Sequence, residues 1–172
     1  VYALNSADGS ELWEFTGARS GIAGQPALDD GTLYVGAFDN RLYALNADDG
    51  AMKWTASATN WFWATPAVED GIVYAASLDG KVYAVRAEDG SDAWPEPFDT
   101  GSPVRSAPVV VGGGLVVASR DAQLHKLNLT TGEPLEGSPV PVGEESVVEA
   151  DLALGEGSRV YVVPRGPNLY TF

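Results

Sequence analysis

The chain of 172 residues carries 24 acidic and 10 basic side chains, which give a formal net charge of −14, and it has no cysteine. This charge disfavours nucleic acid and anionic lipid surfaces as partners, and the lack of cysteine excludes disulfides and thiolate metal sites. Hydrophobic residues make up 45% of the chain, enough for a substantial core, but no apolar run approaches the length of about 18 residues typical of a spanning helix. We therefore predict no nucleic-acid partner and no membrane insertion by this segment.

The first element of the chain, "VYALNSADGSELW" from Val1 to Trp13, is an apolar run, an acidic turn with glycine and a second run that ends in tryptophan. The same element returns at Leu42 and at Val82, where it ends in Trp54 and Trp94. A looser copy begins near residue 124, and a fifth, truncated copy begins at residue 169. Repeats of roughly 40 to 45 residues indicate an architecture built from one supersecondary unit.

A second element fills the space between these copies. Residues 26–38, "PALDDGTLYVGAF", form two apolar runs around an Asp-Gly turn, and residues 39–45 add a tight turn and a third run. Residues 46–54 supply another turn and a fourth run around Trp54. The pattern predicts four antiparallel strands per repeat, joined by hairpins.

The predicted middle strands are continuously apolar, as in Leu33–Val35, Ile72–Ala76 and Leu115–Ala118. Such strands need cover on both faces, which neighbouring repeats supply, and small residues such as Gly36 let adjacent sheets approach closely. No helical periodicity persists for three turns. The sequence therefore predicts an all-β fold, a β-propeller of four-stranded antiparallel blades with about four repeats.

The stretches "YALNSADGSELW", "YALNADDGAMKW" and "YAVRAEDGSDAW" resemble the tryptophan-docking repeat of the quinoprotein-type (PQQ-like) propellers, A-x-D-x-x-T-G-x-x-x-W. The resemblance extends over essentially the whole chain. It implies that Trp13, Trp54 and Trp94 are structural docking tryptophans. WD-repeat propellers are the weaker alternative for the fold, because no W-D dipeptide ends a repeat.

The chain departs from the family pattern at two positions of the repeat. Glu136 stands where the fourth copy would have tryptophan, so we expect different packing to close that blade. The usual aspartate of the motif is replaced in every copy, by Asn5, Asn46, Arg86 and Asn128.

The number of repeats bears on domain organisation. Quinoprotein-type propellers are typically closed rings of seven or eight blades, so the resemblance implies that residues 1–172 form a partial propeller. An open half would leave an apolar blade face and strand edges uncovered. We therefore expect the chain to be part of a longer one or to associate with a second copy.

The residue types and their spacing give little support for a catalytic or metal-binding site. The acidic turns at 29–31, 48–50, 69–71 and 88–90 lack the spacing of calcium loops and match the Asp-Gly turns of hairpins. His125, the only histidine, occupies the repeat position of Tyr43 and Tyr83, which favours a packing role over a catalytic base. We predict no catalytic, cofactor-binding or metal-ligating residue, and Asn128 reads either as a glycosylation acceptor or as a turn residue.

The family resemblance leaves two functions open. Its quinone-dependent dehydrogenases imply a bound quinone, a calcium ion, a catalytic aspartate and often a vicinal disulfide, none of which maps onto a residue here. The non-enzymatic branch, of which the BamB-type lipoproteins that assist outer-membrane barrel assembly are best known, implies an extracytoplasmic scaffold or sensing module without cofactor. We favour that branch, with a protein or polymer partner. The alternative is a piece of a quinone-dependent alcohol or sugar dehydrogenase whose catalytic residues lie elsewhere.

A candidate site follows from comparing the repeats just before each inner strand. There the copies read "RSGIAGQP", "TNWFWATP", "SPVRSAP" and "EESVVEAD", and they differ while the frame positions agree. Variable loops on a repeated frame are where binding function concentrates, and aromatic and arginine side chains dominate protein interfaces. The predicted interaction surface at the channel mouth comprises Arg19, Trp61, Trp63, Arg105 and Glu149.

The aromatic triplet within this surface has two interpretations. Alternation along an extended segment would place Trp61 and Trp63 on one face and Phe62 on the other. Large aromatic side chains are usually buried, so packing between blades competes with partner contact.

Overall fold

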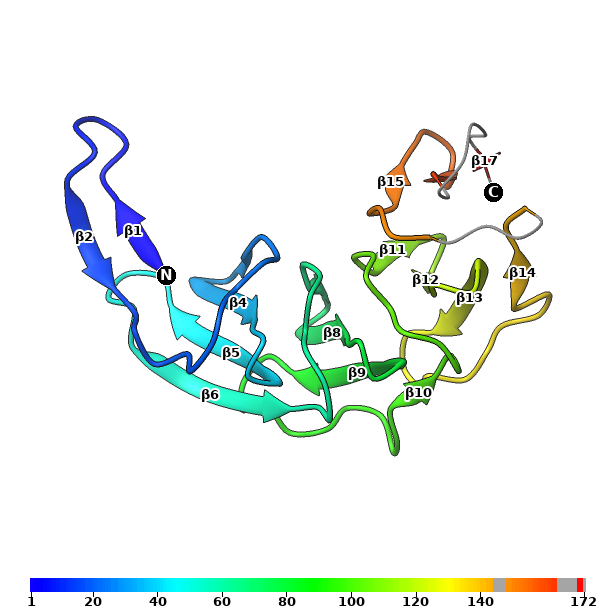
Figure 1. Ribbon diagram of the computed structural model, residues 1–172, viewed down its shortest axis with the longest axis horizontal. Helices are drawn as coiled ribbons and strands as arrows, with labels where there is room; N and C mark the ends of the chain where they lie inside the picture. Colours follow the sequence, from blue (N-terminus) through cyan, green and yellow to red (C-terminus); the bar gives the residue numbers. More distant parts are fainter. Residues whose placement is uncertain (144–147, 164–169, 172) are drawn as a thin grey trace.

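The computed structural model describes residues 1–143, 148–163 and 170–171. These residues form β-sheets and no helix, and the sheets follow one another along an open arc (Figure 1). No helix able to cross a membrane occurs in this part of the chain. The predicted all-β propeller architecture is confirmed.

The described residues form five sheets that succeed each other in chain order, and we call them blades 1 to 5. Blade 1 contains β1 (Tyr2–Leu4) and β2 (Glu11–Glu14), and blade 2 contains β3 (Ala27–Asp29), β4 (Thr32–Gly36), β5 (Arg41–Asn46) and β6 (Met52–Ser57). Blade 3 contains β7 (Ala67–Glu69), β8 (Ile72–Ala76), β9 (Lys81–Arg86) and β10 (Phe98–Asp99). Blade 4 contains β11 (Val109–Val111), β12 (Gly114–Ala118), β13 (Gln123–Asn128) and β14 (Val140–Pro141), and blade 5 contains β15 (Ala153–Leu154), β16 (Val160–Val162) and β17 (Tyr170–Thr171).

Each blade is an antiparallel meander, as the hairpin pattern predicted. Asp30 and Gly31 both have positive φ, 39° and 68°, as required where two residues link β3 to β4. The first strands of the blades, β3, β7, β11 and β15, lie next to one another, while β6 and β10 lie on the convex side of the arc (Figure 1).

Because successive strands alternate in direction, the connections fall at two opposite ends of each blade. One end, here the turn end, carries the acidic turns, as shown by the bond from the Ala47 amide to the Gly31 carbonyl at 2.9 Å. The other, the mouth end, carries the segments that precede the first strands; there the Phe62 amide donates to the Ala37 carbonyl at 3.3 Å.

The three docking tryptophans make the same contact in successive blades. The indole Nε1 atoms of Trp13, Trp54 and Trp94 donate to carbonyls of the next blade, at 2.9 to 3.0 Å, and the acceptors are Ala47, Ala87 and Leu129. Each indole covers a glycine of that blade's turn, with the result that a Cβ atom there would lie 2.6 Å from the ring; these are Gly50, Gly90 and Gly132. Only a residue without a side chain fits, so tryptophan and glycine act as a pair.

Blade 4 closes differently, as its sequence suggested. In blades 2 and 3 the docking indole packs on a tyrosine, with ring centroids 5.8 Å apart for Tyr34–Trp54 and 5.7 Å for Tyr74–Trp94. Blade 4 has Val116 and Glu136 at these positions. It lacks this ring contact but keeps the outer-edge pairings of blade 3: its bridge between Leu127 and Pro134 and its short strand β14 correspond to the bridge between Val85 and Asp92 and to β10.

Close approach between blades 2 and 3 depends on Gly36. A Cβ atom at this residue would lie 2.6 Å from Cβ of Phe62, a fully buried side chain. The expected role of small residues between blades is therefore observed here.

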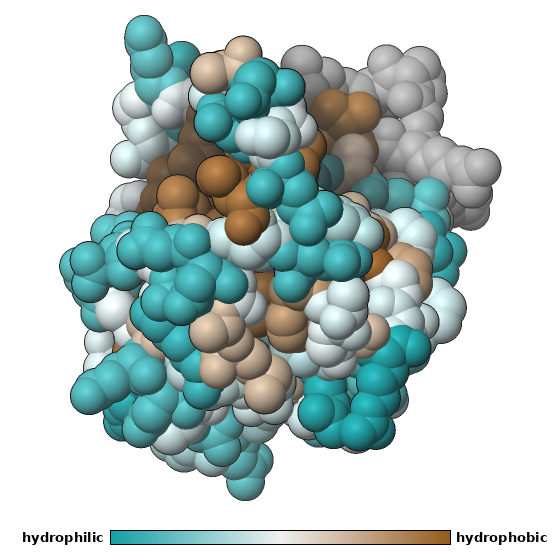
Figure 2. Space-filling model, turned by 90° about the vertical axis from the view of Figure 1, so that its left-hand side faces the viewer, coloured by the Kyte–Doolittle hydropathy of each residue, from teal (hydrophilic) through white to brown (hydrophobic). Residues whose placement is uncertain are grey.

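The blade 1 end of the arc exposes apolar side chains. Figure 2, which views this end, shows them gathered in its upper part, and the exposed large residues of β1 and β2 are Tyr2, Leu4 and Leu12. Residue 169, where the sequence predicted the fifth copy to begin, lies outside the described residues.

Candidate interaction surface at the channel mouth

The segments at the mouth end are held by one hydrogen bond that recurs in blades 2, 3 and 4. The amides of Phe38, Leu78 and Arg120 donate to the carbonyls of Gly21, Trp61 and Pro103, at 2.8 to 2.9 Å. These backbone bonds do not depend on side-chain type. The repeated frame therefore presents different side chains in equivalent places.

A tyrosine-aspartate clasp secures two of these segments. The Tyr43 hydroxyl donates to Asp39 at 2.6 Å, and the same carboxylate accepts the Arg19 amide at 2.8 Å. In blade 3, Asp79 accepts from the Tyr83 hydroxyl at 2.7 Å and from the Thr59 amide at 3.0 Å. Burial raises the pKa of Tyr43 to about 12, and the hydrogen bond to Asp39 is the second largest cause.

Blade 4 replaces this clasp with His125, which is 6% exposed. Its Nε2 lies 3.3 Å from Oγ of Ser119, and that hydroxyl donates to Asp121. Burial lowers the pKa of His125, partly offset by the nearby charge of Asp121. The aspartate contacts the serine and not the imidazole, so this group is not arranged as a Ser-His-Asp catalytic triad.

The aromatic triplet divides between the core and the mouth. Phe62 is 1% exposed and packs edge-on against Tyr83, with ring centroids 5.6 Å apart. Trp61 and Trp63 both stack on Phe38, at centroid distances of 4.6 and 5.1 Å. Among the described residues the two indoles form no close ring pair with each other, and Phe38 is the ring that both contact.

Arg105 and Glu149 extend this stack across the mouth. The guanidinium carbon of Arg105 lies 4.6 Å from the ring centroid of Trp63. Arg105 and Arg120 both approach one carboxylate oxygen of Glu149, at 3.5 and 3.3 Å. The series Trp61, Phe38, Trp63, Arg105, Glu149 and Arg120, which we call the mouth stack, therefore draws on blades 2 and 4 and on the segments before blades 3, 4 and 5.

Four of the five predicted mouth residues meet in this stack, and Arg19 does not. The Arg19 backbone amide binds Asp39, and its side chain is exposed. None of the contacts in the described part of the chain joins that side chain to the stack.

Two members of the mouth stack, Phe38 and Arg120, were missed by the sequence analysis. They occupy equivalent positions just before the turn aspartate in "AFDN" and "SRDA", where the third copy has leucine in "SLDG". The same signal, variation between sister repeats, marks this position. Applying it to the turns as well as to the inter-blade segments would have found both residues.

A cavity of about 320 Å³ lies beside the stack, between the segments that precede blades 2 to 5. Its side chains are mainly polar: Gln25, Trp63, Thr65, Arg105, Glu149 and Asp151. The Asp151 carboxylate accepts the Ala107 amide at 2.7 Å, and the Thr65 hydroxyl accepts the Gln25 amide at 3.1 Å. Side chains that line the cavity thus also join adjacent blades.

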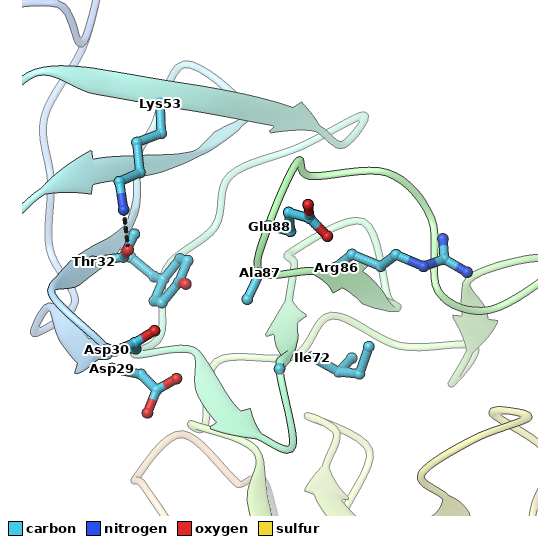
Figure 3. Close-up of a pocket in the computed structure, with 10 residues that line it drawn as sticks. Asp29, Asp30, Thr32, Lys53, Ile72, Arg86, Ala87 and Glu88 are labelled. Carbon is cyan, nitrogen blue, oxygen red and sulfur yellow. Dashed lines mark hydrogen bonds between the residues drawn. The ribbon is translucent and has the colours of Figure 1, made fainter.

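A larger groove of about 530 Å³ lies at the turn end, between blades 2 and 3 (Figure 3). Lys53 donates to the Thr32 hydroxyl there at 2.6 Å, whereas the Arg86 guanidinium extends away from the groove and binds Ser91. No predicted mouth residue lines this groove.

The two candidate chemistries, metal binding and glycosylation, have no dedicated site among the described residues. No group of three or more histidine, aspartate or glutamate side chains is arranged to hold a metal in residues 1–143, 148–163 and 170–171. The Asn128 side chain accepts the Thr130 and Thr131 amides, at 2.8 and 3.0 Å, which gives it a role in the turn.

A family model and a curated protein that match the chain carry the same description. The family model described as outer membrane protein assembly factor BamB matches residues 1–170. A curated protein of that description from Yersinia pestis is 40% identical over 55 residues, which cover 32% of this chain and 14% of that protein.

Solved structures share the fold. BamB from Moraxella catarrhalis superposes with a TM-score of 0.81 and 20% identity, over 95% of this chain and 50% of that one. The computationally designed Ika4 protein gives a TM-score of 0.80 and 19% identity, over 95% of this chain and 98% of that one. A quinohemoprotein alcohol dehydrogenase from Pseudomonas putida gives 0.72 and 20%, over 89% of this chain and 30% of that one. The chain thus spans half the length of the Moraxella protein.

Proposed function

Since the chain belongs to the family of outer membrane protein assembly factor BamB, we propose that it is a non-enzymatic binding module that holds protein partners at its channel mouth. The proposal includes an extracytoplasmic location and a part in cell-envelope assembly, both in keeping with the family's description. One observation carries it: the mouth stack gathers tryptophan and arginine side chains on a frame that is otherwise repetitive.

The chemistry of the stack suits a protein interface. Tryptophan and arginine are the residues that most often dominate binding energy in such interfaces. Trp61 is 40% exposed, and the side chains of Arg105 and Glu149 are each 32% exposed, so a partner can reach them. The stacking of Trp61 on Phe38 and the ion pair between Arg105 and Glu149 hold these side chains in place, which reduces the conformational entropy lost on binding.

We further propose that residues 1–172 contribute one arc to a larger ring of blades. The superposition on half of the Moraxella protein supports this organisation. In such a ring the mouth stack would lie at the entrance of the central channel.

Site-specific photo-crosslinking in the cells that produce the protein tests the proposed function. A photoreactive side chain at residue 61 should yield adducts with envelope-assembly proteins, identified by mass spectrometry. The control is residue 52 on β6, where Met52 is similarly exposed but lies outside the mouth. Equal adducts from both positions, or none from residue 61, would contradict the proposal.

A further inference from the structure

We infer that the partner segment held at the channel mouth is basic, and that one of its arginine or lysine side chains lies on the open face of Trp61. The inference rests on the proposed function and names the chemistry of the partner.

The stack has a cation at its Trp63 side and none at its Trp61 side. Arg105 lies over the Trp63 ring at 4.6 Å, which is the geometry of a cation–π contact. Phe38 covers one face of Trp61, and the indole is 40% exposed. Within the described residues no cation lies over Trp61, so the electron-rich face at this end is available to a charge from outside the chain.

One carboxylate in the cavity beside the stack, that of Asp151, favours the same sign of charge. Glu149 is paired with two arginines, but Asp151 has no ion pair in the described part of the chain. Its Oδ1 accepts the Ala107 amide, and the carboxylate remains exposed to a ligand in the cavity. A second basic side chain of the partner segment would pair with it there.

Long-range electrostatics support a basic partner. The chain has a formal net charge of −14, and its turn end carries acidic pairs at residues 29–30, 48–49, 69–70 and 88–89. This field raises the encounter rate of a cationic segment and opposes an acidic one. Trp61 is the only exposed tryptophan among the described residues, so the field attracts the segment and the mouth selects where it binds.

NMR titration of the 172-residue chain tests the inference through its five tryptophan indole signals. The probe is a flexible peptide with several arginines between glycine and serine residues, and its matched control has citrulline, which is neutral and nearly isosteric, at every arginine. We expect the arginine peptide to shift the Trp61 and Trp63 signals. The signals of Trp13, Trp54 and Trp94, whose indoles are bonded to carbonyls, should stay unchanged.

Two substitutions locate the contacts. Trp61→Leu keeps an apolar side chain but removes the aromatic face, and should weaken binding about two- to fivefold. Asp151→Asn keeps an oxygen for the Ala107 amide but removes the charge, and should weaken binding by a similar factor. Asp49→Asn is the matched control, because Asp49 also accepts a backbone amide, that of Ala51 at 2.9 Å, but lies at the turn end.

Three results would overturn the inference. Equal binding of the citrulline peptide with the same indole shifts would show a mouth that binds peptides without regard to charge, which leaves the proposed function intact. Equal weakening by Asp49→Asn and Asp151→Asn would show attraction to net charge alone. Absence of any shift at Trp61 and Trp63 would rule out a basic partner segment at the mouth. The crosslinking experiment would still test the proposed function.

Discussion

The docking layer, formed by Trp13, Trp54 and Trp94, and the mouth stack contain aromatic residues of the same repeated frame but have different roles. In the docking layer, Trp13, Trp54 and Trp94 each cover a glycine and donate to a carbonyl of the next blade with nearly identical geometry. In the mouth stack, Trp61 and Trp63 stand where the other repeats have unrelated residues. Repetition thus marks what holds the blades together, and variation marks where we propose that a partner binds.

The largest effect that would test this contrast is expected from Trp54→Ala. The substitution removes a buried indole and its bond to the Ala87 carbonyl, so it should lower the free energy of unfolding by about 3–5 kcal/mol. Urea denaturation followed by circular dichroism measures the change. A loss below about 1 kcal/mol would mean that this tryptophan does not hold the blades together.

The glycine partner of the same contact offers a finer test. Gly90→Ala would place Cβ 2.6 Å from the Trp54 ring at a φ of +75°, and should destabilise by about 2–4 kcal/mol. Gly71→Ala is the matched control, because φ is +73° there but no atom lies within 4 Å of the added Cβ. Unfolding by urea should show the greater loss for Gly90, and equal losses would mean that backbone strain alone is responsible.

The clasps at the mouth end should contribute less than the docking layer. Tyr83→Phe removes the bond to Asp79, which keeps its bond from the Thr59 amide, so we expect a loss of about 1–2 kcal/mol. Calorimetric unfolding of the variant beside the parent chain provides the measurement. A loss as large as that of Trp54→Ala would mean that the clasps stabilise the fold as much as the docking layer does.

Blade 4 adds a pH-dependent difference between the clasps. Burial lowers the folded-state pKa of His125 below the ordinary value near 6.5, so the unfolded chain binds the proton more tightly. The corresponding stability is present above about pH 6.5 and is lost as the pH falls from there through the folded-state pKa. His125→Tyr, which restores the residue of blades 2 and 3, should remove this part of the pH dependence.

Urea midpoints of the parent and His125→Tyr chains at about pH 7.5 and 5.5 measure that effect. The parent should lose more stability on acidification than the variant. An identical pH dependence in both chains would exclude His125 as its source.

The sequence was sufficient for the fold because the fold is carried by residues that recur. The Asp-Gly hairpins, the apolar middle strands and the spacing of Trp13, Trp54 and Trp94 all repeat, and each has a local physical cause. Alternation also predicted that Phe62 would separate from its two neighbours, as it does.

The mouth stack was only partly predictable because it is assembled across blades. Phe38 and Trp61 are far apart in a single repeat and meet only when two blades pack, and Arg120 reaches Glu149 from a different turn. Arg19 was included for its position in a variable segment, yet its side chain takes no part in the described stack. Sequence variation locates the mouth, whereas the contacts within it depend on the curvature of the arc.

Two quantities measured on one variant, Trp61→Ala, test whether the mouth stack binds a partner without holding the blades together: the free energy of unfolding and the affinity for the arginine peptide. We expect the free energy of unfolding to stay within about 1 kcal/mol of the parent value, because the indole is partly exposed and outside the docking layer. The affinity should fall about fivefold or more. A large loss of stability with unchanged affinity would show the opposite, because Trp61 would then belong to the frame and not to the binding surface.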